Sequence, residues 1–173
     1  MNKVGIRIAT ERDAKHISIL GKRTFSDTFG HLFRDPSDLD TYLENTFSVA
    51  KMGSSLLKAR NVFWIALVDE TPVGYAKLKL DSSTSFIDIN SICQLQKIYV
   101  LKEYLSLKIG TALQSQLLLK AKTLGYAYIW LSVLNSNDRA IHFYKKNGFT
   151  IMGDHNFTIG KEHFTFFAMG KKL

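Results

Sequence analysis

The most informative segment of the chain is Val133-Leu-Asn-Ser-Asn-Asp-Arg-Ala-Ile-His-Phe-Tyr-Lys-Lys-Asn-Gly-Phe149. It reads as the end of a strand, a polar loop, a short helix and a glycine that stops the helix. Asn137 and Tyr144 are seven positions apart, and at about 100° per residue they point in nearly the same direction, two turns from each other. An amide near a helix start and a phenol two turns further on can therefore face one cleft, which suits a ligand that enters past the helix N-terminus.

Hydrophobic patterns on both sides of this segment predict alternating strands and helices. Residues 127–133 are apolar on both faces, as expected of a central strand, and residues 108–124 form a strong amphipathic helix that Gly125 stops. Residues 4–9 predict a first strand, the stretch from Thr10 to Asp13 a capped helix start, and Asp35-Pro36 the start of a second helix. The remaining predicted elements are a helix at 49–59, strands at 62–68, 73–80 and within 86–100, and a terminal hairpin at 150–153 and 162–169.

The pattern V-x-x-x-N-x-x-A-x-x-x-Y-x-x-x-G-F in residues 133–149 resembles the GNAT superfamily of N-acetyltransferases, with six positions that agree in order and spacing. These enzymes move an acetyl group from acetyl-CoA to an amine. The order of predicted elements is also similar to that of the family, so the resemblance covers nearly the whole chain. It implies one domain over residues 1–173 of α/β (α+β) class, in which a mixed, largely antiparallel twisted sheet splays at the cofactor cleft and carries helices on both faces.

The family has a phosphate-binding loop, R/Q-x-x-G-x-G/A, where this chain has Leu101-Lys-Glu-Tyr-Leu-Ser-Leu-Lys-Ile-Gly110. Unpaired N–H groups and the positive end of a helix attract phosphate oxygens there. Leu105 replaces the usual Arg or Gln and Lys108 replaces the first glycine, so CoA affinity is the property that these departures would change. An ordinary strand-to-helix turn is the alternative interpretation. The resemblance implies that the CoA pyrophosphate is bound by Lys108, Ile109, Gly110 and Thr111.

Attack of a neutral amine on a thioester needs a proton acceptor, a stabilised oxyanion, a proton for the leaving thiolate and alignment of both substrates. The resemblance implies that Tyr144 is the general acid, since a phenol with a reference pKa of about 10 stays protonated at pH 7. It also implies that the strand residues Ile98, Tyr99 and Val100 contact the pantetheine arm and acetyl group, and that Asn137 and, more weakly, Asn135 bond that arm. The alternatives are a buried helix-face tyrosine, ordinary core strand residues and a helix cap.

No general base is evident in the sequence. Many relatives carry a glutamate on the strand before the phosphate loop, where this chain has Gln94, Gln96 and Lys97. Asp88 lies upstream and reads equally well as a surface residue. We therefore expect deprotonation to pass through ordered water.

Three segments are similar to bacterial spermidine/spermine (polyamine) N-acetyltransferases: residues 25–31, 42–44 and 95–104. A polyamine acceptor needs carboxylates to pair with its ammonium groups, and aromatic faces add cation–π attraction. This implies that Asp27, Phe29 and Tyr42 bind the acceptor, with Asp38, Asp40 and Glu44 as further acids. The alternative is that these acids face solvent and the aromatic residues pack the first helices.

Composition limits the remaining classes of function. A chain of 173 residues with 46% hydrophobic residues suits one globular domain. The single cysteine, Cys93, excludes an intrachain disulfide and favours a cytoplasmic setting, and neither it nor the histidines show metal-ligand spacing. We see no signal peptide and no apolar run of about 20 residues, so no membrane is expected. The net charge of +8 is scattered without a nucleic-acid-binding motif.

The leading hypothesis is direct acetyl transfer in a ternary complex, from acetyl-CoA to a small primary amine such as a polyamine. Two alternatives stay open. A protein N-terminal or lysine acetyltransferase requires an open groove, and a weakly active CoA-binding regulatory module is favoured by the altered phosphate loop and the missing base. Acetyl-CoA is the co-substrate expected, no metal is expected, and the apolar C-terminal strands allow a homodimer.

Overall fold

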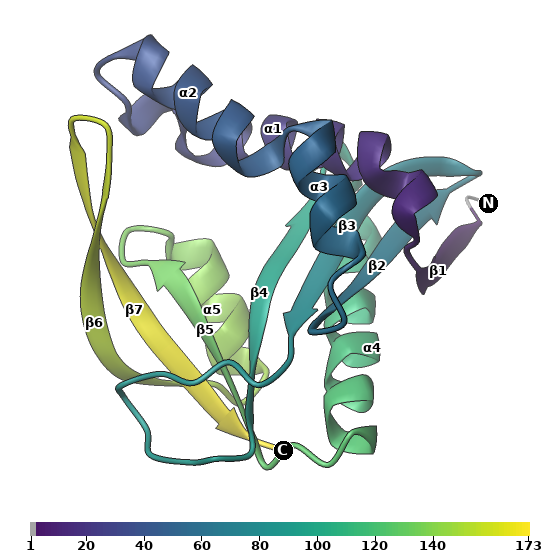
Figure 1. Ribbon diagram of the computed structural model, residues 1–173, viewed down its shortest axis with the longest axis vertical. Helices are drawn as coiled ribbons and strands as arrows, with labels where there is room; N and C mark the ends of the chain where they lie inside the picture. The colour runs from purple at the N-terminus through teal and green to yellow at the C-terminus, as the bar shows by residue number, and fades with distance from the viewer. Residues whose placement is uncertain (1–2) are drawn as a thin grey trace.

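The computed structural model describes residues 3–173 of the chain (Figure 1). The predicted order of strands and helices is confirmed, with the third helical stretch present as a separate helix. In chain order the elements are β1 (Val4–Ile8), α1 (Ala14–Phe29), α2 (Pro36–Phe47), α3 (Val49–Leu56), β2 (Asn61–Val68), β3 (Thr71–Lys79), β4 (Ile92–Val100), α4 (Ile109–Thr123), β5 (Tyr128–Leu134), α5 (Asp138–Lys146), β6 (Thr150–Ile159) and β7 (Glu162–Lys172).

The seven strands form one sheet in the order β1-β2-β3-β4-β5-β7-β6. Every neighbouring pair is antiparallel except β4 and β5, which run parallel because α4 carries the chain back across the sheet. Helices α1 to α3 cover one face of the sheet, and α4 and α5 lie on the other (Figure 1). The prediction of a mixed, largely antiparallel sheet with helices on both faces is confirmed.

The sheet splits between its two parallel strands. Strand β4 pairs with β5 only where Ile92, Cys93 and Gln94 lie opposite residues 128–130. Beyond Gln94 the strands diverge, so that β4 reaches Val100 with a ladder to β3 on one side only. This divergence confirms the predicted splay and leaves main-chain groups of β4 facing an opening rather than a neighbour.

Each face of the sheet has its own hydrophobic core. Leu113 and Leu117 of α4 pack with Ile129 and Leu131 of β5, in keeping with the apolar stripe that predicts α4. On the other face, Ile17 of α1 and other residues of the first helices pack over β2, β3 and β4. The two faces of the sheet beside the opening thus belong to two separately packed layers.

The start of α1 is fixed by the predicted capping box. The backbone N–H of Thr10 donates to the Asp13 carboxylate at 2.8 Å, and the box geometry is complete. The guanidinium of Arg7 on β1 donates two hydrogen bonds of 2.8 Å to the same carboxylate. These bonds to Arg7 and the N–H of Thr10 hold the pKa of the buried Asp13 carboxyl below its usual value, against the opposing effect of desolvation. The first helix is thereby tied to the edge of the sheet.

The terminal hairpin is longer than predicted. Strand β6 continues to Ile159, which pairs with Glu162 across a turn in which Gly160 has a φ of +56°. The polar residues Asp154 and Asn156 hide the alternation that would have extended the predicted strand. The extra length matters, because residues of the hairpin reach the opening between β4 and β5.

Candidate active site

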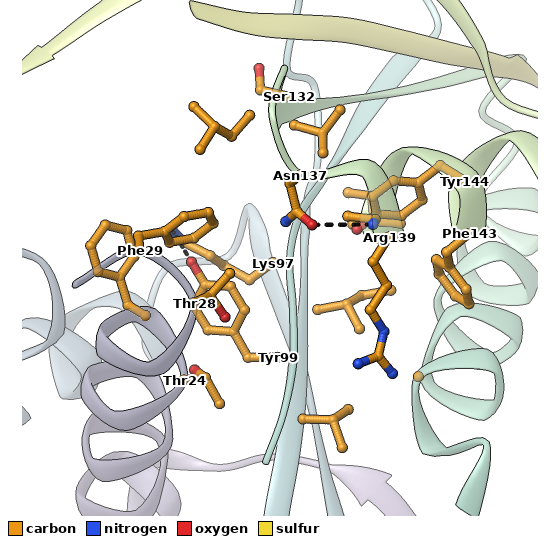
Figure 2. Close-up of a pocket in the computed structure, with 18 of the residues that line it drawn as sticks. Thr24, Thr28, Phe29, Lys97, Tyr99, Ser132, Asn137, Arg139, Phe143 and Tyr144 are labelled. Atoms are coloured by element: carbon orange, nitrogen blue, oxygen red, sulfur yellow. Dashed lines mark hydrogen bonds between the residues drawn. The ribbon is translucent and has the colours of Figure 1, made fainter. Parts of the chain in front are cut away.

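A cavity of about 730 Å³ occupies the place where β4 and β5 separate (Figure 2). Its walls come from α1, α2, β4, the start of α4, β5, α5 and the β6–β7 hairpin. Most of the predicted site residues line it, namely Asp27, Phe29, Tyr42, Ile98, Tyr99, Val100, Lys108, Gly110, Thr111, Asn137 and Tyr144. The fold therefore brings together residues that are more than a hundred positions apart in the sequence.

Two predicted residues are not among those that line the cavity. The side chain of Ile109 is fully buried in the core beneath α4. Asn135 is exposed, and its backbone N–H donates to the carbonyl of Thr165 on β7 at 3.0 Å. In this structure both residues support the walls rather than form the cavity surface.

Tyr144 lies on the inner side of α5, against the rings of Phe143 and Phe149 at centroid distances of 5.3 and 5.7 Å. Burial is the main cause that raises the pKa of its phenol well above the usual value, and the nearby Tyr99 adds to the effect. The hydroxyl is thus a proton donor throughout the neutral range. Figure 2 shows the phenol on the α5 side of the cavity, beside the helix start at Asn137.

Asn137 caps a helix, as its position allowed, and its side chain also lines the cavity. As the N-cap of α5, its Oδ1 accepts a hydrogen bond of 3.2 Å from the backbone N–H of Ala140. Because that bond occupies the oxygen, the amide nitrogen is left to face the cavity (Figure 2). A helix cap and a ligand donor are therefore compatible in one side chain.

The loop before α4 takes the shape of a glycine-rich turn without the first glycine. After a short 3₁₀ turn at Lys102–Leu107, Lys108 adopts a left-handed conformation with φ 56° and ψ 25°, which glycine adopts most readily. A Cβ atom on Gly110 would meet open space, so the backbone there is accessible. Lys102, Lys108 and Arg139 all line this end of the cavity, and Arg139 was missed because it stands in the polar first turn of a helix.

Lys97 is the most unusual residue at the other end of the cavity. Its Nζ lies 5.2 Å from the centre of the Phe47 ring, 5.4 Å from that of Tyr99 and 3.4 Å from the Tyr99 hydroxyl. Burial lowers the pKa of this ammonium group. The sequence offered one signal for it, because Lys97 is the single charged residue in the segment Ile92–Val100.

The sequence matches the profile of the acetyltransferase (GNAT) family over residues 24–149. The chain belongs to the GNAT family. The match runs from α1 to the end of α5, and so includes the splayed strands, the loop before α4 and Tyr144. As a GNAT protein it is an acetyl-CoA-dependent N-acetyltransferase.

Similar proteins span the same length as this GNAT enzyme. An uncharacterized N-acetyltransferase of Lactobacillus delbrueckii subsp. lactis is 29% identical over 174 residues, covering 100% of this chain and 99% of that protein. An uncharacterized N-acetyltransferase of Mycobacterium bovis is 28% identical over 161 residues, or 93% and 98% of the two chains. The crystal structure of the PaiA N-acetyltransferase of Thermoplasma acidophilum, in complex with coenzyme A, superposes with a TM-score of 0.81 at 22% identity, with 99% of each chain covered.

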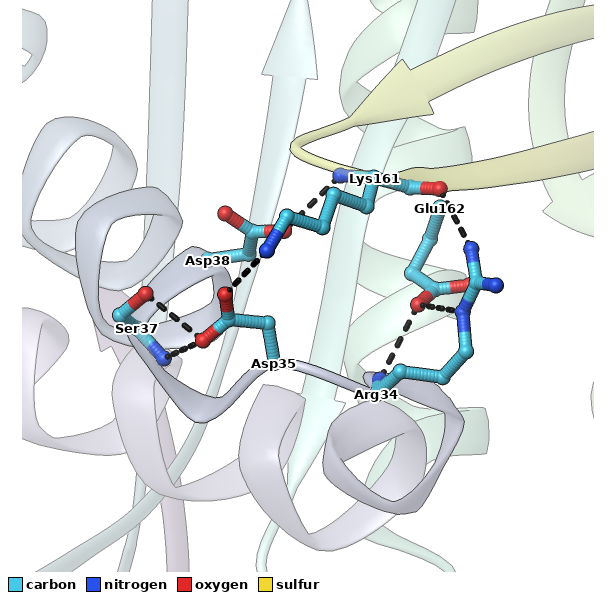
Figure 3. Close-up of polar contacts among 6 residues, drawn as sticks. All are labelled: Arg34, Asp35, Ser37, Asp38, Lys161 and Glu162. Carbon is cyan, nitrogen blue, oxygen red and sulfur yellow. Dashed lines mark hydrogen bonds and ion pairs between the residues drawn. The ribbon is translucent and has the colours of Figure 1, made fainter.

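Two of the four acids expected at the acceptor end, Asp38 and Glu44, have other partners in this GNAT fold. A group of polar contacts, here called the clasp, joins the start of α2 to the β6–β7 turn (Figure 3). In the clasp, Arg34 Nε bonds Glu162 at 2.8 Å, Lys161 Nζ bonds Asp35 at 2.7 Å, and the Lys161 backbone N–H bonds Asp38 at 2.8 Å. Glu44 pairs with Lys22 on α1. Among the described residues that line the cavity, Asp27 is the one carboxylate.

The clasp lies next to the cavity, because its residues Lys161 and Glu162 stand between Ile159 and Phe164, which line the wall. Beneath it, the Phe33 and Phe164 rings pack at 5.7 Å, one from the segment before α2 and the other from β7. Phe164 and Ile159 of the hairpin line the cavity below this contact. The first helices and the C-terminal hairpin, from opposite ends of the sequence, thus cover the acceptor side together.

Within residues 3–173, no group of three or more potential metal ligands is present. Across the same residues, none of the helices has both the length and the hydrophobicity required to span a membrane.

Proposed function

We propose that this GNAT enzyme acetylates a small primary amine by direct transfer from acetyl-CoA, with both substrates held in the cavity between β4 and β5. The observation that supports this most is the position of the protonated Tyr144 phenol on the wall of an opening in the sheet. Such an opening lets an extended substrate arm lie beside unpaired main-chain groups of β4, in the position that a neighbouring strand would otherwise occupy. The reaction then occurs away from bulk water.

The residues present fit acetyl-CoA as a substrate. The left-handed turn at Lys108 and the accessible backbone at Gly110 lie at the start of α4, where backbone N–H groups attract phosphate. The cations Lys102, Lys108 and Arg139 line the same end. Their positive charges attract phosphate groups and so compensate for the missing first glycine of the loop. The coenzyme A bound to the similar Thermoplasma acidophilum protein supports this assignment.

The proposed chemistry uses the main chain of β4 and the phenol of α5. Backbone groups of Ile98, Tyr99 and Val100 align the thioester, and their N–H groups stabilise its oxygen as charge develops. Tyr144 gives its proton to the leaving thiolate. A raised phenol pKa weakens the acid, but the same desolvation raises the proton affinity of a thiolate beside it, so the transfer stays balanced.

A polyamine remains the acceptor that we propose first. Asp27 at the exposed rim can pair with a distal ammonium group, while Phe29 and Tyr42 offer aromatic faces further in. The ammonium of Lys97 disfavours a second charge close to it and so favours the neutral form of the reacting amine. A polyamine with a charged amine near Asp27 and a neutral amine near Lys97 matches this difference in charge between the two ends of the site.

Two further proposals concern alternatives and setting. The clasp over the acceptor end favours a small molecule over a protein N-terminus or a lysine side chain, which needs an open groove. A regulatory CoA-binding module remains the second candidate because Leu105 and Lys108 alter the phosphate loop.

We also propose a cytoplasmic location, in keeping with the buried thiol of Cys93, and a homodimer through the exposed edge strand β6.

The test is thiol release from acetyl-CoA with spermidine, with single amino acids and with a panel of peptides, together with calorimetry of CoA binding. We expect binding of CoA and turnover of at least one small amine, with spermidine the first candidate. Turnover of peptides alone would replace the small-molecule proposal by the protein acetyltransferase. Binding without turnover of any amine would leave the regulatory module, and no binding would remove every function that depends on CoA.

A further inference from the structure

A serine hydroxyl and a histidine ring meet at the inner wall of the cavity. Ser132 lies on β5 beyond Trp130, where β5 has already separated from β4, and its side chain lines the cavity. Its Oγ atom is 2.9 Å from Nε2 of His155 on β6. Neither residue takes part in the chemistry assigned to Tyr144 and β4.

Small residues let the histidine reach across an intervening strand. Ser132 pairs with Ala168 on β7, and Ala168 pairs with Gly153 on β6, so the row next to the serine carries little side-chain bulk. His155 itself pairs with Phe166 on β7. The imidazole therefore extends over β7 to the serine from the far side of the hairpin.

The ring of His155 is held in one orientation by aromatic neighbours. It stacks on Phe166 with centroids 5.7 Å apart and planes at 18°, and Phe86 packs against it at 6.1 Å. The groups that face it from β5, β7 and the segment before β4 are thus one hydroxyl and two phenyl rings, and within residues 3–173 no charged side chain is hydrogen-bonded to it. Asp154 precedes it on β6 and points to the opposite face.

We propose that Ser132 and His155 form the proton relay that deprotonates the acceptor amine, an inference that rests on the proposed function. Strand β4 carries no carboxylate that could act as the base, and its polar residues are Gln94, Gln96 and Lys97. Imidazole is the side chain whose reference pKa, about 6.5, lies nearest neutral pH. Ser132 touches the substrate, and His155 acts through it.

The proton movements balance over one turnover. The ammonium form of the acceptor gives a proton to Oγ of Ser132 while the serine passes its own to Nε2 of His155, which becomes imidazolium. The freed amine lone pair forms the N–C bond to the acetyl carbon, and the C–S bond breaks as Tyr144 protonates the thiolate. The proton still carried by the acetylated nitrogen returns to the phenol, and the imidazolium releases its proton to solvent.

The pH dependence of kcat/KM tests the relay, using the amine of the panel above that gives the highest value. An enzyme with its own base accepts the ammonium form, so kcat/KM should rise while that base loses its proton and then stay level up to about pH 9. An enzyme without the base depends on the free amine in solution, which increases about tenfold per pH unit below the amine pKa. We expect kcat/KM of the parent to show the level region. In His155→Gln and Ser132→Ala we expect kcat/KM to rise continuously, about tenfold per pH unit.

The hairpin supplies a matched control. His163 on β7 is bonded to Thr158 on β6 by a hydroxyl–imidazole contact of 3.0 Å, but it is exposed and does not line the cavity. His163→Gln should keep the level region, and CoA binding by calorimetry should be unchanged in all three variants. At pH 7.5 we expect kcat/KM to fall about 100-fold in His155→Gln and Ser132→Ala.

The outcomes separate the two proposals. A parent that turns over its amine while His155→Gln keeps the level region overturns the relay alone. A parent with no turnover of any amine overturns the proposed function, and the relay with it. If His155→Gln loses CoA binding or unfolds, Ser132→Ala decides, because it removes a single hydroxyl oxygen and should show the same continuous rise.

Discussion

The ammonium group of Lys97 lies 3.4 Å from the hydroxyl of Tyr99 and near the rings of Phe47 and Tyr99, and within residues 3–173 it forms no salt bridge with a carboxylate. A buried charge without a partner destabilises the fold, and proteins retain such groups mainly where they act on a ligand. The charge of Lys97 beside Tyr99 is thus expected to lower the stability of the fold at this end of the cavity. Its consequences for stability and for turnover can be measured separately.

Replacing Lys97 by Met should stabilise the protein by about 1 kcal/mol or more at pH 7, because the aliphatic chain remains and the desolvated charge is removed. The folded-state pKa of this base is lowered, so the unfolded chain binds its proton more tightly, and parent stability should rise with pH from the lowered pKa to about 10.4. Urea unfolding at pH 7 and pH 10 checks this, and the advantage of Lys97→Met should shrink at pH 10. The exposed Lys58→Met is the control, and an equal gain there would contradict the prediction.

Replacing Tyr144 by Phe should lower kcat about 100-fold, since the leaving thiolate loses its proton donor. The affinity for CoA by calorimetry should change less than about twofold, because the ring and its packing against Phe149 remain. Tyr128→Phe, which removes a hydroxyl from β5 outside the cavity, should leave both quantities as in the parent. Unchanged turnover in Tyr144→Phe would remove this phenol from the acid role.

Replacing Lys108 by Gly should raise the unfolding free energy by about 0.5 kcal/mol. This is the difference between the cost of a left-handed residue with a Cβ and the entropy cost of glycine. Both variants lose the charge, but Lys108→Ala keeps a Cβ atom in the strained turn. We therefore expect Lys108→Ala to bind CoA more weakly than Lys108→Gly. Calorimetry at two salt concentrations should give a weaker salt dependence in both variants than in the parent. Equal affinities for the two variants would mean that the Cβ atom does not obstruct the ligand.

Replacing Asp13 by Asn should destabilise the fold by about 2 kcal/mol at pH 7, because two charged hydrogen bonds from Arg7 are weakened. The lowered pKa of this acid means that its contribution is full above about pH 4 and is lost as pH falls through the folded-state value. Denaturant unfolding at pH 7 and pH 3 should therefore show a smaller difference between parent and variant in acid. Asp40→Asn, at an exposed position, should differ little from the parent at either pH.

The fold was largely predictable because local rules and the global topology agree in this chain. The apolar stripe of α4, the doubly apolar β5 and the capping box at Thr10 each specify an element that the structure contains. Their order then restricts the sheet, since the crossover through α4 must place β5 parallel to β4. The length of β6 was missed because its outward positions carry Asp154 and Asn156, which read as a loop.

The candidate site was predictable where it depends on a motif and not where it depends on three-dimensional contact. Tyr144 and Asn137 follow from their spacing along α5, and both line the cavity. The pairing of Ser132 with His155 was not foreseeable, because it spans an intervening strand and a hairpin register that no local pattern encodes. The roles of Asp38 and Glu162 in the clasp depend likewise on how the two ends of the chain meet.

The single-sided ladder of β4 beyond Gln94 has a consequence for the dynamics of the protein before it binds any substrate. Amide hydrogens that face the opening have only solvent to bond, so they should exchange with deuterium faster than those that face β3. In the proposed complex the pantetheine arm would take the position of the absent neighbour, so CoA binding should slow that exchange from Leu95 to Val100 first. The substrate would then complete the secondary structure of the enzyme that consumes it.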